Sequence, residues 1–179
     1  EAITLASIVE KDTGVAAERR TVAGVYTNRL AVGMKLQADP TIIYPITKGK
    51  PLGRRIRQSE INAVNDYNTY TMTGLPKGPI TNPGRASIEA VLNPARTEAL
   101  YFVADGTGGH VFANTLADHN RNVEKWFALR RARGEMEIEG ALAAAAFGAR
   151  RADHRAQRLA DDRAGIGFDR GHRLGGADL

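Results

Sequence analysis

Residues Ala2–Thr13, AITLASIVEKDT, place the carboxylate of Glu10 at the end of a nearly continuous apolar stretch. Apolar side chains would lie on almost every side of a helix formed here, which predicts a buried rather than an amphipathic helix. Thr13 and Gly14 follow as a stop signal, so Glu10 is expected in the last helical turn, where backbone carbonyls supply partial negative charge. Both features disfavour an ionised carboxylate, and the sequence therefore predicts a raised pKa for Glu10.

A glutamate that keeps its proton near neutral pH can donate that proton to a glycosidic oxygen. The alternative is that Glu10 extends into water beside Lys11 and Asp12, because strongly perturbed acids are a minority among glutamates. The segment alone leaves both interpretations open.

The 179 residues suffice for one domain with a real core, and no apolar run approaches the roughly 20 residues that cross a bilayer. Without cysteine, disulfides and thiolate metal sites are excluded. A net charge of +5 suits an anionic partner, although the charges are interspersed. Because the sequence opens inside an expected helix, we interpret it as a fragment of a longer chain, with any anchor upstream.

Downstream, residues 15–32 show helical spacing of apolar side chains, and Gly33 follows the expected end. Glu18, Arg19 and Arg29 are expected on the solvated face of this helix. Asp39 and Pro40 predict a second helix, with Asp39 as its N-cap, that runs to Pro45.

Residues 47–57 form a basic loop, and residues 66–83, DYNTYTMTGLPKGPITNP, form a rigid extended segment rich in proline and tyrosine. Tyrosine rings can cover sugar rings while asparagine and threonine bind their hydroxyls, so this segment suits a carbohydrate groove. It suits a surface loop folded onto the core equally well.

The clearest β-hairpin is formed by residues 100–104 and 110–114, which the turn DGTGG joins. A helix is expected at residues 85–93, started by Asn82 and Pro83, and another is expected from residue 116. The predicted fold class is therefore α+β, with helices packed around a small antiparallel hairpin. Residues 139–179, rich in Ala, Arg and Gly, are expected to form a weakly ordered tail after a domain at residues 1–138.

The four histidines lack zinc-ligand spacing, so no metal site and no cofactor is expected. Ser7 lies one helical turn before Glu10, but no histidine is placed to activate it, which argues against a serine hydrolase.

The segments LASIVEKDT, NRLAVGMKLQADPTIIY, YNTYTMTGLPKGPITNPG, LYFVADGTGGHVF and LADHN occur in this order, and together they resemble the YceG-like endolytic murein transglycosylases over about residues 1–134. The resemblance implies a lysozyme-like catalytic domain. It makes Glu10 the single catalytic acid and base, and it places Gln37, Tyr67, Asn68 and Tyr70 along the glycan cleft. Asp12 stands where such sequences often have a second glutamate, and it should point away from the face of Glu10.

The same resemblance implies non-hydrolytic cleavage of MurNAc–GlcNAc bonds in nascent strands, with 1,6-anhydroMurNAc ends as products. It implies peptidoglycan strands as substrate, peptidoglycan synthases as partners, and no nucleic acid. It also implies an inner-membrane anchor, absent from this sequence, that holds the domain in the periplasm.

Three alternatives stay open. A lysozyme-like muramidase would use Glu10 with Asp39 or Asp12 and a water molecule. A non-catalytic peptidoglycan-binding domain would not need Glu10. A nucleic-acid-binding protein would use the basic residues 48–57 and the arginine-rich tail, with strongly salt-dependent affinity.

Overall fold

The computed structural model describes residues 1–134 of the chain. The chain forms two compact units, residues 1–122 and 123–179, and their boundary falls inside the last helix. The described elements are, in order, α1 (Ala2–Asp12), the 3₁₀ turn η1 (Ala16–Glu18), α2 (Arg19–Ala31), α3 (Pro40–Thr47), α4 (Gln58–Ile61), α5 (Arg85–Leu92), β1 (Tyr101–Ala104), β2 (His110–Ala113) and α6 (Leu116–Ala132). The predicted tail at residues 139–179 lies outside the described residues.

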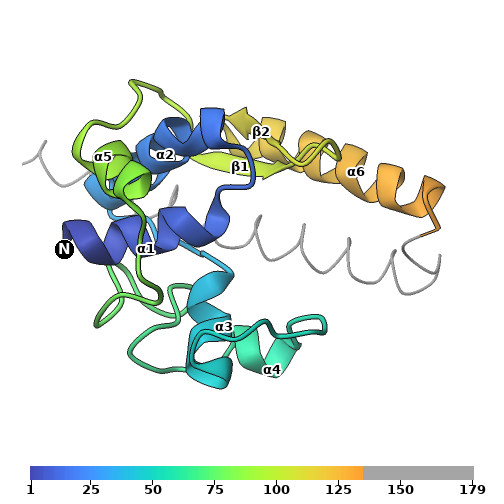
Figure 1. Ribbon diagram of the computed structural model, residues 1–179. Coiled ribbons are helices and arrows are strands. Elements are labelled where there is room, and N and C mark those ends of the chain that lie inside the picture. The colour runs from blue at the N-terminus through green and yellow to red at the C-terminus, as the bar shows by residue number, and fades with distance from the viewer. Residues whose placement is uncertain (135–179) are drawn as a thin grey trace, which may run out of the picture. The chain divides into compact units, whose positions relative to one another are not determined.

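Helices α1, α2 and α5 pack against one another and carry the core of the first unit (Figure 1). Ile8 and Val9 of α1, and Val22 of α2, have no exposed surface, and Ala90 of α5 is almost completely covered. Burying each branched side chain stabilises the fold by about 1.5–3 kcal/mol. The prediction of a buried helix that carries Glu10 in its last turn is confirmed.

Strands β1 and β2 form the predicted hairpin, an antiparallel two-stranded sheet in which Phe102 pairs with Phe112. Gly106 and Gly108 have positive φ angles in the connecting turn, which glycine adopts at the lowest cost. Together with the helices, this sheet makes the fold class α+β, as predicted.

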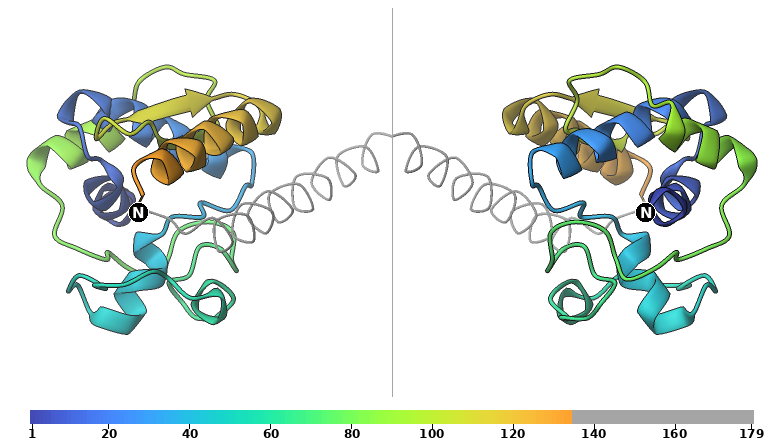
Figure 2. Two further views of the ribbon diagram at one scale, coloured as in Figure 1. Left: turned by 90° about the vertical axis from the view of Figure 1, so that its right-hand side faces the viewer. Right: turned by 90° about the vertical axis from the view of Figure 1, so that its left-hand side faces the viewer.

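Helices α3 and α4 and the loops around them lie on the other side of α1 from α2, in both Figure 1 and Figure 2. Helix α3 begins at Pro40 as predicted, but it does not end at Pro45, which lies inside it. A proline in the last turn removes only one helical N–H, and its φ angle suits a helix. Lys48, in the left-handed conformation, ends α3 and donates its N–H to the carbonyl of Tyr44.

The predicted capping bond of Asp39 is wrong, although the residue does occupy the N-cap position. Its side chain makes no cap hydrogen bond, and its carboxylate accepts a hydrogen bond from the Tyr70 hydroxyl instead, at 2.5 Å. Helix α5 is likewise preceded by Gly84 rather than capped by Asn82. At Asp39, a tertiary contact determines what the side chain binds.

Arg29 was expected in solvent, but it is only 8% exposed. Its guanidinium donates to the carbonyls of Leu100, Lys35 and Leu36 at 2.6–3.1 Å. It therefore joins α2 to the chain before β1 and to the link that leads to α3. None of the described helices is long and apolar enough to span a membrane.

Candidate active site

Glu10 lies in the last turn of α1 and is half-buried. Its Oε2 atom accepts a hydrogen bond from the Ser87 hydroxyl at 2.5 Å and another from the backbone N–H of Gly84 at 3.1 Å. Both donors belong to the beginning of α5, where the helix presents unpaired N–H groups and partial positive charge. The N-terminus of one helix thus faces the carboxylate at the C-terminus of another.

This arrangement overturns the predicted raised pKa of Glu10. The hydrogen bond from Ser87 lowers the pKa most, the Gly84 N–H lowers it further, and the charges of Arg19 and Lys11 act in the same direction. Burial raises the pKa, but these contributions outweigh it. Without ligand, Glu10 is therefore a carboxylate at neutral pH.

Ser87 is a site residue that the sequence analysis missed. It is fully buried, and it lies 77 residues from Glu10 in the chain. The available signal was the predicted start of a helix near residue 84, because the first turn of a helix supplies donors that suit an anion.

The backbone of Gln37 lies beside the tyrosine–asparagine segment. Its backbone N–H donates to the carbonyl of Thr69 at 3.2 Å, and the Thr69 hydroxyl accepts from the N–H of Ala38 at 3.0 Å. Gln37 has a φ angle of 53°, in the left-handed region that a non-glycine residue seldom adopts. Such a conformation costs on the order of 1 kcal/mol and persists where surrounding contacts fix it.

The structure corrects the prediction that the Asn68 side chain faces the glycan. Asn68 has no exposed surface, and its amide donates to the carbonyls of Ala63, Ile61 and Glu60 at 2.7–3.3 Å. Its Oδ1 atom accepts the N–H of Tyr70 at 3.0 Å. Since the amide already bonds to backbone on both sides, Asn68 holds this segment in shape.

Tyr67 and Tyr70 differ in their surroundings. The Tyr67 ring packs against Tyr44 with centroids 4.9 Å apart and is half-buried against the core. Tyr70 is also half-buried, and its hydroxyl donates to Asp39. Of the four predicted cleft residues, Gln37, Tyr67 and Tyr70 thus keep some exposed surface.

Asp12 points away from Glu10 to a different set of partners. Its carboxylate accepts a hydrogen bond from the hydroxyl of Tyr26, and it interacts electrostatically with Asp39 and Tyr70. Burial raises the pKa of Asp12 to about 7; the Tyr26 hydrogen bond opposes this shift and the charge of Asp39 adds to it. Desolvation of its carboxyl also raises the pKa of Asp39, although the residue as a whole keeps an exposed surface.

Replacing Asp12 by asparagine is expected to stabilise the chain at pH 8 by about 2–4 kcal/mol and to change little at pH 4. Between about pH 4 and pH 7 the carboxyl loses its proton in the unfolded chain but keeps it in the folded chain. Stability therefore falls as the pH rises through this window in wild type. Asparagine cannot ionise, and it still offers an oxygen to Tyr26.

Chemical denaturation at the two pH values measures this difference. Asp66→Asn is the control, because Asp66 forms an exposed ion pair with Lys77 that contributes little. Equal stability of Asp12→Asn and wild type at pH 8 would contradict a protonated, buried Asp12.

Residues 1–125 match the YceG-like family. The chain belongs to the YceG-like family. A crystal structure of a YceG-like protein from Listeria monocytogenes is similar to this chain, with a TM-score of 0.59 and 39% sequence identity over 66% of this chain and 37% of the other.

Two curated relatives of this YceG-like chain are named endolytic murein transglycosylase. The one from Bacillus subtilis (strain 168) is 41% identical over 126 residues, which cover 70% of this chain and 34% of the relative. The one from Streptococcus pneumoniae serotype 2 (strain D39 / NCTC 7466) is 41% identical over 129 residues, which cover 69% of this chain and 23% of the relative. The chain thus spans a third or less of the length of these relatives.

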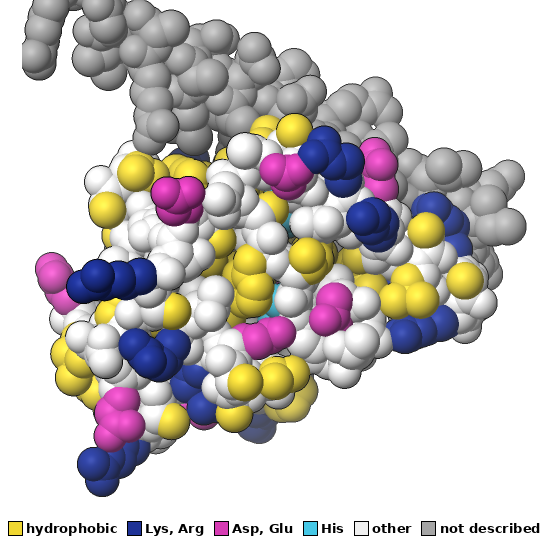
Figure 3. All heavy atoms as spheres, turned by 90° about the horizontal axis from the view of Figure 1, so that it is seen from above, with side chains coloured by type: hydrophobic (Ala, Val, Ile, Leu, Met, Phe, Trp, Pro, Cys, Tyr) yellow, Lys and Arg dark blue, Asp and Glu magenta, His cyan; other side chains and the backbone are white. Residues whose placement is uncertain are grey.

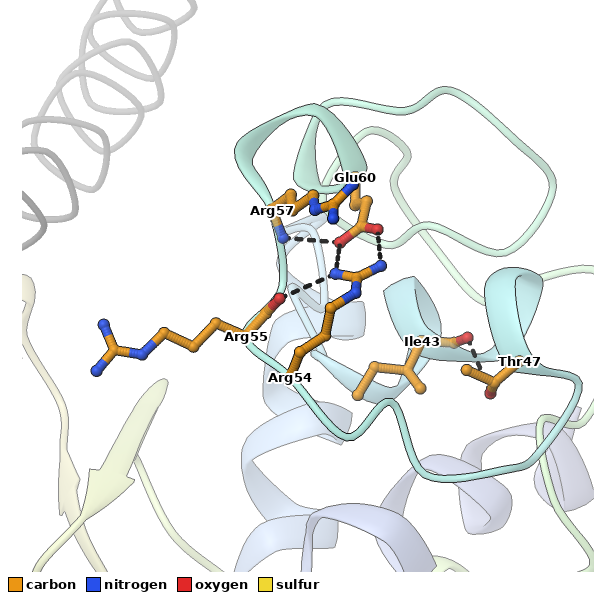
Figure 4. A network of polar contacts seen from close by, with 6 residues as sticks. All are labelled: Ile43, Thr47, Arg54, Arg55, Arg57 and Glu60. Atoms are coloured by element: carbon orange, nitrogen blue, oxygen red, sulfur yellow. Dashed lines mark hydrogen bonds and ion pairs between the residues drawn. The ribbon is translucent and has the colours of Figure 1, made fainter. Parts of the chain in front are cut away.

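The basic residues 48–57 of this YceG-like chain are partly neutralised within the fold. Arg54 forms a two-armed ion pair with Glu60 at 2.5 and 3.0 Å, and Glu60 also accepts the backbone N–H of Arg57 (Figure 4). These bonds lower the pKa of Glu60 to about 2, with the largest contribution from Arg54. Figure 4 shows the side chain of Arg55 pointing away from this network.

Charged side chains do not gather in one block on the face seen in Figure 3, where basic, acidic and apolar groups are interspersed. Within residues 1–134, no three His, Asp or Glu side chains are grouped so that they could hold a metal ion. The polar groups that meet at the candidate site are the Glu10 carboxylate, the Ser87 hydroxyl and the Gly84 N–H.

Proposed function

We propose that this YceG-like chain is the catalytic domain of an endolytic peptidoglycan lytic transglycosylase. It would cleave MurNAc–GlcNAc bonds in nascent glycan strands without water and leave 1,6-anhydroMurNAc ends. The observation that carries the proposal is the single carboxylate of Glu10, at the end of a buried helix and held by Gly84 and Ser87. The family match supports it, because residues 1–125 contain all three residues, and the relatives named endolytic murein transglycosylase support it too.

In the first step, Glu10 donates a proton to the glycosidic oxygen while the bond from that oxygen to C1 of MurNAc breaks. The acetamido group of the same sugar stabilises the positive charge that develops at C1. Since Glu10 is ionised in the free chain, it takes up this proton when a bound glycan excludes water, because desolvation favours the neutral carboxyl.

In the second step, the Glu10 carboxylate removes the proton of the C6 hydroxyl, and O6 bonds to C1. The hydrogen bonds from Ser87 and Gly84 stabilise the carboxylate that this step requires. One carboxylate serves both steps, and no water is consumed. Paired carboxylates, as in ordinary glycosidases, are not needed.

Gln37, Tyr67 and Tyr70 are the residues that we propose to line the glycan cleft. Asn68 acts through them, because its Oδ1 holds the backbone of Tyr70 and its amide holds the chain before Tyr67. We further propose, from the family resemblance, that the domain acts at the outer face of the inner membrane near the peptidoglycan synthases.

Digestion of purified murein, followed by mass spectrometry of the new ends, tests the reaction. A transglycosylase leaves anhydro ends, each lighter by one water than the reducing ends left by a muramidase. Reducing MurNAc ends would favour hydrolysis.

Ser87→Ala is expected to shift the alkaline limb of the pH profile of kcat/KM toward higher pH. The Ser87 hydrogen bond lowers the pKa of Glu10 more than any other contact, so its loss raises that pKa. The acid step requires protonated Glu10, and the activity therefore persists to higher pH in the variant. Rates of murein cleavage between pH 4 and pH 8 measure the shift.

Ser7→Ala is the matched control. Ser7 is as fully buried as Ser87, and its hydroxyl bonds to Thr4 and Ile80 rather than to Glu10. Each variant is expected to lose about 1 kcal/mol of stability. A pH profile that is the same for Ser87→Ala and Ser7→Ala would show that Ser87 does not tune the catalytic acid.

A further inference from the structure

A pocket of about 550 Å³ lies between the beginning of α2 and one face of α5. This volume is in the range of about 300–1,000 Å³ that is usual for small-ligand sites. From α5 the pocket receives Ala86, Glu89, Ala90 and Asn93, whose spacing of three, four and seven residues places them on one helix face. Helices α2 and α5 lie side by side in Figure 1.

Two arginines give the pocket its charge. Arg19 is half-buried, and its Nε atom is inaccessible to solvent and has no hydrogen-bond partner among the described residues. Arg20 uses its Nε to donate to the carbonyl of Asn93 at 2.9 Å. Glu89, the one acidic residue in the lining, is paired with Arg85 at 2.7 Å. An inaccessible guanidinium N–H without a protein acceptor is free to donate to an anion that enters the pocket.

The rest of the lining is small and apolar. Ala16, Ala86 and Ala90 present methyl groups, and Leu92, which also lines the pocket, is 70% exposed. Exposed large apolar side chains beside a cavity are typical of binding surfaces. The pocket thus suits an anionic ligand with small apolar groups.

The pocket adjoins the candidate active site. Ala86 lines it, and Ser87, which donates to Glu10, lies on the neighbouring face of α5. Arg19 lines it too, and its charge acts on the Glu10 carboxylate. A ligand in the pocket can therefore be joined covalently to a sugar that lies at Glu10.

We propose that this pocket binds the peptide stem of the peptidoglycan strand, with a stem carboxylate at Arg19 and Arg20 and the alanine methyl groups against Ala86, Ala90 and Leu92. The stem is attached through the lactyl ether of MurNAc, and it combines small side chains with free carboxylates. The inference rests on the proposed function, because the stem enters the pocket when its own MurNAc lies at the catalytic acid.

Binding of a muramyl peptide by the full chain tests the proposal without any bond being cleaved. The probe is MurNAc–L-Ala–D-Glu, a monosaccharide with free carboxylates, and it is compared with its diamide and with MurNAc alone by calorimetry. We expect the free acid to bind at least fivefold more tightly than either comparison ligand. Equal affinity for the three ligands, or no binding of any, overturns the proposal.

A charge placed at the rim makes the test specific. Leu92→Glu removes one apolar contact for both ligands and adds a charge that repels only the free acid, so it is expected to weaken binding of the free acid at least fivefold more than binding of the diamide. Val32→Glu is the matched control, since Val32 is also exposed and lies beyond the other end of α2. Equal effects of the two substitutions on binding of the free acid would contradict the proposed stem site.

The result separates this proposal from the catalytic one. Tight, carboxylate-dependent binding without murein cleavage would leave the pocket in place and reject the proposed reaction. Normal cleavage to anhydro ends, with no preference for the free acid, would reject the stem site alone.

Discussion

Glu10→Gln will reduce glycan cleavage by about 10³- to 10⁴-fold, the range that general acid and base catalysis supplies. Glutamine has the same shape as glutamate, and its amide oxygen can still accept the hydrogen bonds from Gly84 and Ser87. What the variant lacks is the proton for the glycosidic oxygen and the base for the C6 hydroxyl. Quantitative mass spectrometry of ends released from murein measures the loss.

Glu98→Gln provides the control, because Glu98 is an exposed glutamate whose one side-chain hydrogen bond, from Asn114, is 3.5 Å long. It should cleave at the wild-type rate. Thermal unfolding should show that Glu10→Gln is folded, with stability within about 1 kcal/mol of wild type. A folded Glu10→Gln variant that still produces anhydro ends at the normal rate would remove Glu10 from the mechanism and favour a binding domain.

Asn68→Ala is expected to destabilise the fold by about 3 kcal/mol, because the substitution leaves buried backbone carbonyls without their donor. It also removes the acceptor for the Tyr70 N–H, and the cavity adds to the cost. For a domain of this size, such a loss lowers the melting temperature by about 10 °C or more. Calorimetry or circular dichroism will show the shift.

Asn82→Ala serves as the comparison, since Asn82 is an exposed asparagine of the same extended segment. Its free energy of unfolding should lie within about 0.5 kcal/mol of the wild-type value, as is usual for surface substitutions. If Asn68→Ala instead melted like wild type and raised KM for glycan, Asn68 would contact the sugar directly and the burial argument would fail.

The elements that depend on local pattern were predictable from sequence. The apolar run of α1, the alternation of β1 and β2 around a glycine-rich turn, and the glycine after α2 each determine the local structure by themselves. Helix α6 begins where it was expected, after Thr115, whose hydroxyl accepts the N–H of Asp118.

The electrostatics of the site were not predictable in the same way. The neighbours of Glu10 along α1 are apolar and suggest a raised pKa, whereas the groups that decide its pKa lie 74 and 77 residues away. The prediction that Arg29 lies in solvent was wrong for a similar reason, because the backbone carbonyls that its guanidinium binds belong to other segments. Hydrophobic periodicity indicates which face is covered, but it does not reveal which polar groups meet there.

Because Gly84 and Ser87 are far from Glu10 in the sequence, the hydrogen bonds that set the pKa of Glu10 exist only in the folded chain. In an unfolded polypeptide Gly84 and Ser87 are remote from Glu10, which then titrates as an ordinary surface glutamate does. A fragment that stops before α5 would retain the carboxylate and lose the groups that tune it. The chain therefore becomes able to catalyse the proposed reaction only when it folds.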